Sequence, residues 1–223
     1  SSQYIFPIHV AQKVADAGGQ AVALSLLLRT AVACSHVASE KILYECFERA
    51  CILFEDYIHD STQCRVCLSS ILDALYHVDT LDPETRDMLA FKTQSYCSKL
   101  LRRKDQCQAM MECSRIYWQE HGVKNGAMVL ETLSRAERTI HALQEQNSIM
   151  ERSEQDARVP GYLLVELLAH YISFKTLGVH EIHTDDIQRI VDLARKEVAS
   201  EVCQHDDVLQ KYCSVTCSRV DRI

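Results

Sequence analysis

The chain has 223 residues, and only nine of them are glycine or proline, roughly a third of the usual share. So few turn-forming residues exclude β-sandwiches, β-barrels and glycine-rich nucleotide-binding folds, and an apolar content of 47% argues against disorder. The net charge of −7 argues against nucleic-acid binding and against direct binding to an anionic membrane, because both need a basic face.

Apolar residues recur at steps of three and four along almost the whole chain, which predicts successive amphipathic helices. The clearest stripe comprises Leu43, Cys46, Phe47, Ala50, Cys51 and Phe54. Breaks fall at the glycines of residues 18–19, 122 and 126. The predicted helices, about ten in number, cover residues 3–17, 20–38, 40–59, 61–79, 83–103, 105–120, 126–148, 155–177, 184–202 and 205–221.

Three short patterns predict helix starts. Asp82 precedes Pro83, so the aspartate can cap the backbone while the proline takes the first helical position. Residues 105–108, Asp-Gln-Cys-Gln, have the spacing of a capping box. Residues 184–186, Thr-Asp-Asp, place negative charge at the positive end of a helix dipole.

Taken in pairs, the helices repeat about every 40 residues, which is the period of HEAT-like helical hairpins. We therefore predict an all-α fold, a right-handed α-solenoid of about five hairpins in a single domain over residues 1–223. A closed helical bundle would produce similar stripes, but the even cadence favours the solenoid. The chain begins Ser-Ser-Gln, so we expect a piece of a longer chain. The longest apolar stretch, residues 21–28, is far too short to span a bilayer.

Eleven cysteines are the unusual feature of the composition. Most fall at core positions of the predicted helices, so we expect buried, reduced thiols in a cytosolic protein rather than a disulfide framework. Cys64 and Cys67 form a CxxC pair, but no strand precedes it and no second pair of zinc ligands follows, which favours packing. His180 and His183 are expected in a solvated turn. We expect no metal, no cofactor and no catalytic site.

Two features carry candidate binding residues. Residues 102–104, Arg-Arg-Lys, are the only basic run, and they fit either a helix C-terminus or an exposed edge for an acidic patch on a partner. Trp118 is the sole tryptophan, beside Tyr117. Neighbours on a helix point about 100° apart, so at most one of the two enters the core fully and the other is an interface candidate.

Several stretches also carry a family pattern. Residues 44–56 read Tyr-Glu-x-Phe-x-x-Ala-x-x-x-Phe-Glu-Asp, and residues 98–106 read Ser-Lys-Leu-Leu-Arg-Arg-Lys-Asp-Gln. Tyr117 and Trp118, then residues 124–126 (Lys-Asn-Gly) and 171–174 (Tyr-Ile-x-Phe), follow in order. These five stretches resemble the C-terminal solenoid of the retromer scaffold family, vacuolar protein sorting-associated protein 35. The resemblance covers most of residues 20–200, with Lys104 where the family commonly has proline.

The resemblance implies an arch of helical hairpins whose C-terminal half cradles a metallophosphoesterase-fold retromer subunit that acts as a scaffold, not as a phosphatase. It also implies an arrestin-like subunit bound through an N-terminal half outside this piece, and a homodimer contact at the arch apex. The complex would sort transmembrane cargo from endosomes toward the Golgi or the plasma membrane, with the chain cytoplasmic and peripheral on endosomal membranes through its partners. The partner-binding residues expected on this basis are Arg102, Arg103, Lys104, Asp105, Gln106, Tyr117, Trp118, Lys124 and Asn125.

Two other classes stay open. One is a different helical-repeat adaptor, of the nuclear-transport or coat type. The other is an enzyme that uses clustered cysteine and histidine with a metal.

Overall fold

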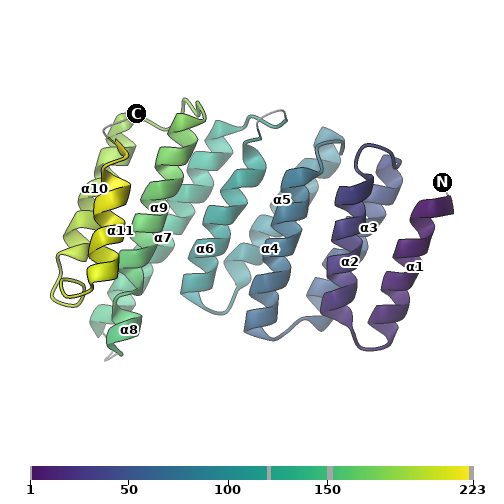
Figure 1. Cartoon of the computed structure of the whole chain (residues 1–223), viewed down its shortest axis with the longest axis horizontal. Coiled ribbons are helices and arrows are strands. Elements are labelled where there is room, and N and C mark those ends of the chain that lie inside the picture. The colour runs from purple at the N-terminus through teal and green to yellow at the C-terminus, as the bar shows by residue number, and fades with distance from the viewer. Residues whose placement is uncertain (1, 120–121, 150–152, 221–223) are drawn as a thin grey trace. The chain divides into compact units, whose positions relative to one another are not determined.

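The computed structural model describes residues 2–119, 122–149 and 153–220, and these residues form helices joined by short turns (Figure 1). The helices are α1 (Ser2–Asp16), α2 (Gln20–Cys34), α3 (Glu40–Tyr57), α4 (Ser61–His77), α5 (Pro83–Lys99), α6 (Arg103–Cys113), the 3-10 turn η1 (Ser114–Tyr117), α7 (Gly126–Ile149), α8 (Glu154–Ala157), α9 (Val159–Thr176), α10 (Thr184–Val198) and α11 (Asp207–Cys217). The predicted all-α, solenoid-type fold is confirmed.

The chain divides into two compact units. The first comprises residues 1–102 with 119–123 and contains α1 to α5. Within it, α2 packs against α1, α3 and α4. The α3 stripe predicted from the sequence, from Leu43 to Phe54, is buried throughout. An amphipathic helix turns its apolar face toward the helices packed against it.

The second unit comprises residues 103–118 with 124–223 and contains α6 to α11. Helix α9 packs against α7, α10 and α11. It is apolar around most of its circumference, with Leu164, Leu168 and Tyr171 each fully buried. Such a helix is stable only with neighbours on several sides, and α9 accordingly forms the centre of this unit.

The helix starts predicted at Asp82 and at residues 184–186 are confirmed. Asp82 accepts hydrogen bonds from the backbone N–H groups of Glu84 and Thr85, both at 3.0 Å. The Thr85 hydroxyl, together with these backbone bonds, lowers the pKa of the Asp82 carboxyl. At α10, the backbone N–H of His183 donates to Asp186 Oδ2 at 3.0 Å.

Several predicted boundaries are wrong. The helix predicted over 83–103 ends at Lys99, because Leu100 leaves it in an extended conformation (φ −57°, ψ 144°) and buries its side chain. The next helix begins at Arg103, so Asp105 lies in the first turn of α6 and is not its N-cap. The helix predicted over 155–177 is divided at Arg158 into α8 and α9, since Pro160 has no N–H to continue the ladder.

The helix predicted over 105–120 also ends early. Helix α6 tightens into η1 after Cys113, and Trp118 then adopts an extended conformation (φ −141°, ψ 104°). Among the described residues, Trp118 and Lys124 form the only β-bridge, which is antiparallel. None of the described helices is long and apolar enough to cross a bilayer.

Candidate functional site

Four of the predicted binding residues lie together in the second unit, where the chain turns from η1 into α7. We call Tyr117, Trp118, Lys124 and Asn125 the Trp118 corner. The Asn125 N–H donates to the Tyr117 carbonyl at 2.9 Å, and Asn125 Oδ1 accepts from the Met128 N–H at 3.1 Å. The asparagine therefore closes the turn and caps the start of α7 at once.

Only one residue of the aromatic pair is fully buried, as the sequence predicted, although the two residues are not on a regular helix. Tyr117 is buried, with 6% of its surface exposed. Trp118 is half-buried, and Lys124 Nζ lies 4.7 Å from the centroid of its ring, within range for a cation–π interaction. The exposed side of the corner therefore presents an aromatic surface with a positive charge above it.

The basic run lies elsewhere. Arg102, Arg103 and Lys104 are all exposed, and within the described part of the chain none of them is paired with a carboxylate. Arg102 belongs to the first unit, whereas Arg103 and Lys104 lie in the first turn of α6 in the second. Arg103 opens α6 and Tyr117 ends η1, so at about 1.5 Å per residue they lie roughly 20 Å apart along the axis.

The remaining predicted residues, Asp105 and Gln106, are half-buried in that first turn of α6. The interpretation of the basic run as a helix C-terminus is wrong for Arg103 and Lys104, because α5 ends at Lys99 and both residues open α6. Two cations at a helix N-terminus face the positive end of the dipole. This placement is unfavourable for α6 itself.

Lys104 also lines a hollow that sequence reasoning missed. This hollow has a volume of about 680 Å³ and lies between α6, α9 and α11, with Gln108, Tyr162, Glu166 and Tyr212 in its wall. Gln108 Nε2 donates to Glu166 Oε2 at 3.0 Å. These residues come from three helices distant in sequence, so no local motif could have grouped them.

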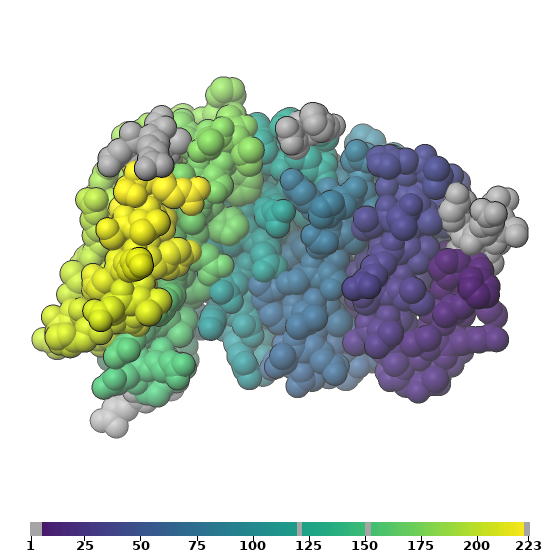
Figure 2. Space-filling view, viewed as in Figure 1, coloured from purple at the N-terminus to yellow at the C-terminus, as the bar shows by residue number. Residues whose placement is uncertain are grey.

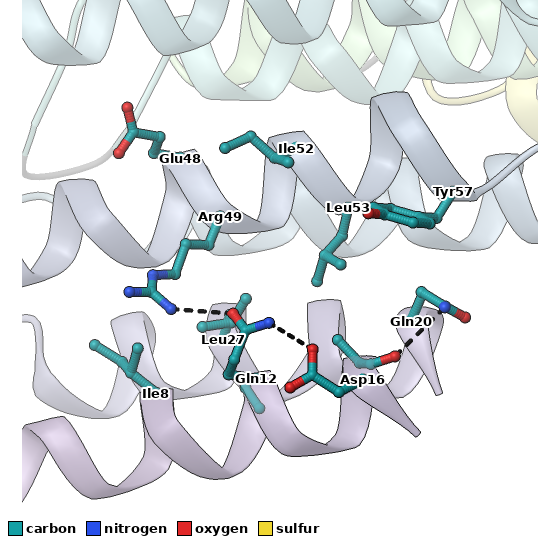
Figure 3. A pocket seen from close by; sticks show the side chains of 12 residues that line it. Ile8, Gln12, Asp16, Gln20, Leu27, Glu48, Arg49, Ile52, Leu53 and Tyr57 are labelled. Carbon is teal, nitrogen blue, oxygen red and sulfur yellow. Dashed lines mark hydrogen bonds between the residues drawn. The ribbon is translucent and has the colours of Figure 1, made fainter. Parts of the chain in front are cut away.

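In the first unit, α1 and α3 flank a groove with a volume of about 620 Å³ (Figure 3). Arg49 reaches across it and donates from Nη1 to Gln12 Oε1 at 3.3 Å, and Gln12 Nε2 donates to Asp16 Oδ1 at 2.9 Å. Ile52 and Tyr57 also line the groove and are 45% and 58% exposed. These two residues lie outside the buried stripe of α3, and this is the one sequence signal that could have predicted the groove.

The expected burial of the cysteines is confirmed for all but one of them. Ten of the eleven cysteines are buried and none is bonded to another. Cys64 differs, because it is only half-buried and its thiol donates to the Ile58 carbonyl at 3.1 Å. Burial raises the pKa of both Cys64 and Cys67, the opposite of what a reactive CxxC pair needs.

The histidines also behave as surface residues. His180, His183 and the more distant His205 are exposed. No group of three or more metal-ligating side chains comes together among the described residues.

Comparison with known proteins identifies relatives of one kind. Residues 3–197 match the sequence model of the family Vps35, vacuolar protein sorting-associated protein 35. Vacuolar protein sorting-associated protein 35B of Arabidopsis thaliana is 35% identical over 182 residues, which cover 81% of this chain and 22% of that protein. Protein 35C of the same plant is 31% identical over 186 residues, covering 82% of this chain and 23% of the relative. The chain thus spans less than a quarter of the curated relatives it matches.

Proposed function

Because the chain belongs to the vacuolar protein sorting-associated protein 35 family, we propose that it is the C-terminal part of a retromer scaffold. In this role it binds a metallophosphoesterase-fold retromer subunit on a surface prepared by its helices. The assembly sorts endosomal cargo, including retrograde transport to the Golgi. The chain itself is cytoplasmic and reaches the endosomal membrane through its partners, and it carries no catalytic activity.

The family match over residues 3–197 is the observation that carries this proposal. The physical features agree with a binding role. Packed helices present a preformed surface, so docking loses little conformational entropy. The Trp118 corner supplies a half-buried aromatic ring of the kind that anchors interfaces, and the unpaired cations at the start of α6 favour a partner with an acidic patch.

A binding experiment with the purified metallophosphoesterase-fold subunit tests the proposal. Calorimetry would compare the wild-type chain with Trp118→Ala and Arg103→Glu, and Lys196→Glu, at an exposed position of α10, serves as a charge-matched control for Arg103→Glu. We expect the wild-type chain and Lys196→Glu to bind, and the other two variants to bind at least about tenfold more weakly.

The possible outcomes test the identity of the partner and the location of the binding surface separately. Absence of binding by the wild-type chain would overturn the partner and revive a different helical adaptor. Full binding by both Trp118→Ala and Arg103→Glu would retain the partner but exclude these residues from the interface. Thermal unfolding of each variant shows whether a loss of binding is a loss of folding.

A further inference from the structure

Two cysteines on the last described helix hold their sulfur atoms in contact. Cys213 and Cys217 are four residues apart on α11, where side chains share one face, and their Sγ atoms are 3.9 Å apart. Both belong to the apolar stripe of α11, which packs against α9 and α10. Helix α11 lies on the outside of its unit, on the face turned toward the viewer in Figure 2.

The same two thiols line a hollow that opens at the surface between α10 and α11. Its volume is about 430 Å³. Cys213 is 6% exposed and Cys217 is 9% exposed, so each sulfur lies at the inner wall. The other lining residues are Arg195, Val198, Ala199, Gln210, Ser214 and Ser218, and none of these carries a carboxylate or an imidazole.

We propose that Cys213 and Cys217 form a two-thiolate site for a thiophilic ion of low coordination number, with Cu(I) as the metal ion. Sulfur ligands select soft ions. Among the described residues, the lining adds no carboxylate or imidazole to the two thiols. It therefore does not supply the four ligands of a zinc site or the oxygen ligands that a hard cation needs.

Binding of Cu(I) to the two thiols requires no oxidant. Binding of Cu⁺ forms two Cu–S bonds, breaks two S–H bonds and releases two protons, leaving a complex with one negative charge. Arg195 lines the same hollow and stabilises that charge. Burial, with the neighbouring Cys217, raises the pKa of Cys213 to about 11, while Arg195 acts in the opposite direction. Because both thiols must lose their protons to bind the ion, the apparent affinity rises with pH.

The location separates this site from the family's shared surface. Helix α11 begins at Asp207, beyond the matched residues 3–197. The other closely spaced pair, Cys64 and Cys67, offers a contrast, because the Cys64 thiol already donates to a backbone carbonyl. That pair provides a matched control within the same chain.

A covalent probe tests the geometry. Phenylarsine oxide condenses with two neighbouring thiols to form two As–S bonds and one water, with no change of oxidation state. The reduced, folded chain would be treated with one equivalent, digested with trypsin and mapped by mass spectrometry. Cleavage after Lys211 and Arg219 yields a peptide that contains Cys213 and Cys217 and no other cysteine, whereas cleavage after Arg65 separates Cys64 from Cys67. We expect the adduct within the 212–219 peptide.

A metal titration tests the ion. Cu(I), kept reduced under anaerobic conditions, would be competed against bathocuproine disulfonate for the wild-type chain and two paired variants. We expect Cys213→Ser with Cys217→Ser to weaken the tightest site by more than about 100-fold, since loss of an outer-shell partner alone costs 10–100-fold. Cys64→Ser with Cys67→Ser should leave that site unchanged.

Two results would overturn the proposal. One is an arsenical adduct outside residues 212–219, and the other is a tightest Cu(I) site that survives loss of Cys213 and Cys217. Circular dichroism of the folded variants excludes unfolding as the cause of a loss. A single variant, Cys217→Ala, keeps the packing of α11 while removing one ligand, and it should lose the arsenical bridge as well.

Discussion

The guanidinium of Arg86 on α5 donates a hydrogen bond to the backbone carbonyl of Val78, just past the end of α4, over 2.7 Å. Its second nitrogen donates to the Leu75 carbonyl at 3.1 Å. Arg86 is only 5% exposed, and burial lowers the pKa of its guanidinium. One buried cation therefore satisfies carbonyls that α4 leaves open at its C-terminus, where positive charge is favoured.

Replacing this arginine should destabilise the first unit. Arg86→Met keeps much of the volume but leaves buried carbonyls without these donors, at a cost of about 2–4 kcal/mol. The free energy of unfolding in urea measures the effect. Arg103→Met, at an exposed arginine, is the matched control and should change stability by less than about 0.5 kcal/mol. Equal stability of the two variants would show that the α4 cap is not important.

The half-buried His170 on α9 predicts a pH dependence of stability. Burial, followed by the neighbouring Arg115, lowers its pKa from 6.5 to about 4. Between these values the unfolded chain binds a proton that the folded chain does not, so this contribution is full above pH 6.5 and is lost as the pH falls toward 4. The loss is up to about 3 kcal/mol.

Removing the titrating group tests this assignment. His170→Phe keeps an aromatic ring beside Phe174, whose ring centroid lies 6.4 Å from that of His170. Unfolding in urea at several pH values between 4 and 7 should show a shallower decline for the variant than for the wild-type chain. Parallel curves for the two proteins would mean that other groups cause the acid sensitivity.

The Trp118 corner carries its own spectroscopic reporter. Trp118 is the only tryptophan of the chain, so its fluorescence reports on this turn alone. Lys124→Met removes the cation above the ring and should shift the emission maximum while costing only about 0.5–1 kcal/mol of stability. Docking of a partner on the corner should shift the emission again. Unchanged emission in a saturated complex would place the interface elsewhere.

The outcome for α3 and Trp118 shows what local sequence can predict. The α3 stripe was found because burial on one helix face repeats every three to four residues, and the start of α5 because Asp82 and Pro83 act on their own backbone. The exit of Trp118 from the helix and the burial of Arg86 depend on neighbouring helices. Those contacts have no signature within a short window of sequence.

The same distinction between local sequence and tertiary contacts applies to the candidate site. Tyr117, Trp118, Lys124 and Asn125 were expected as binding residues from the family resemblance, and one tight turn brings them together in the structure. The basic run was expected to bind as well, and α6 separates its Arg103 from Tyr117. The α1–α3 groove and the thiol-lined hollow of α11 escaped notice, because each is made by helices that meet only in three dimensions.

Gly161 near the start of α9 sets how closely α11 can approach. A Cβ atom at this position would lie 2.9 Å from Leu209 Cδ2 and 3.3 Å from Cys203 Sγ. Leu209 is fully buried, so it cannot move aside freely. Overpacking typically costs about 1–3 kcal/mol, which exceeds the gain of up to about 1 kcal/mol from removing a helical glycine. Gly161→Ala should therefore destabilise the second unit and loosen α11.

Gly126→Ala is the matched control for this prediction. The nearest atoms there belong to the side chain of Glu181, which is exposed and can swing away, so the helical gain should dominate. Hydrogen exchange of the α11 amides, read beside the unfolding free energy, distinguishes the two variants. We expect the α11 amides to exchange faster in Gly161→Ala than in the wild-type chain, and at the wild-type rate in Gly126→Ala. Equal exchange in both would mean that α11 is held by its other contacts and that the close approach at Gly161 is incidental.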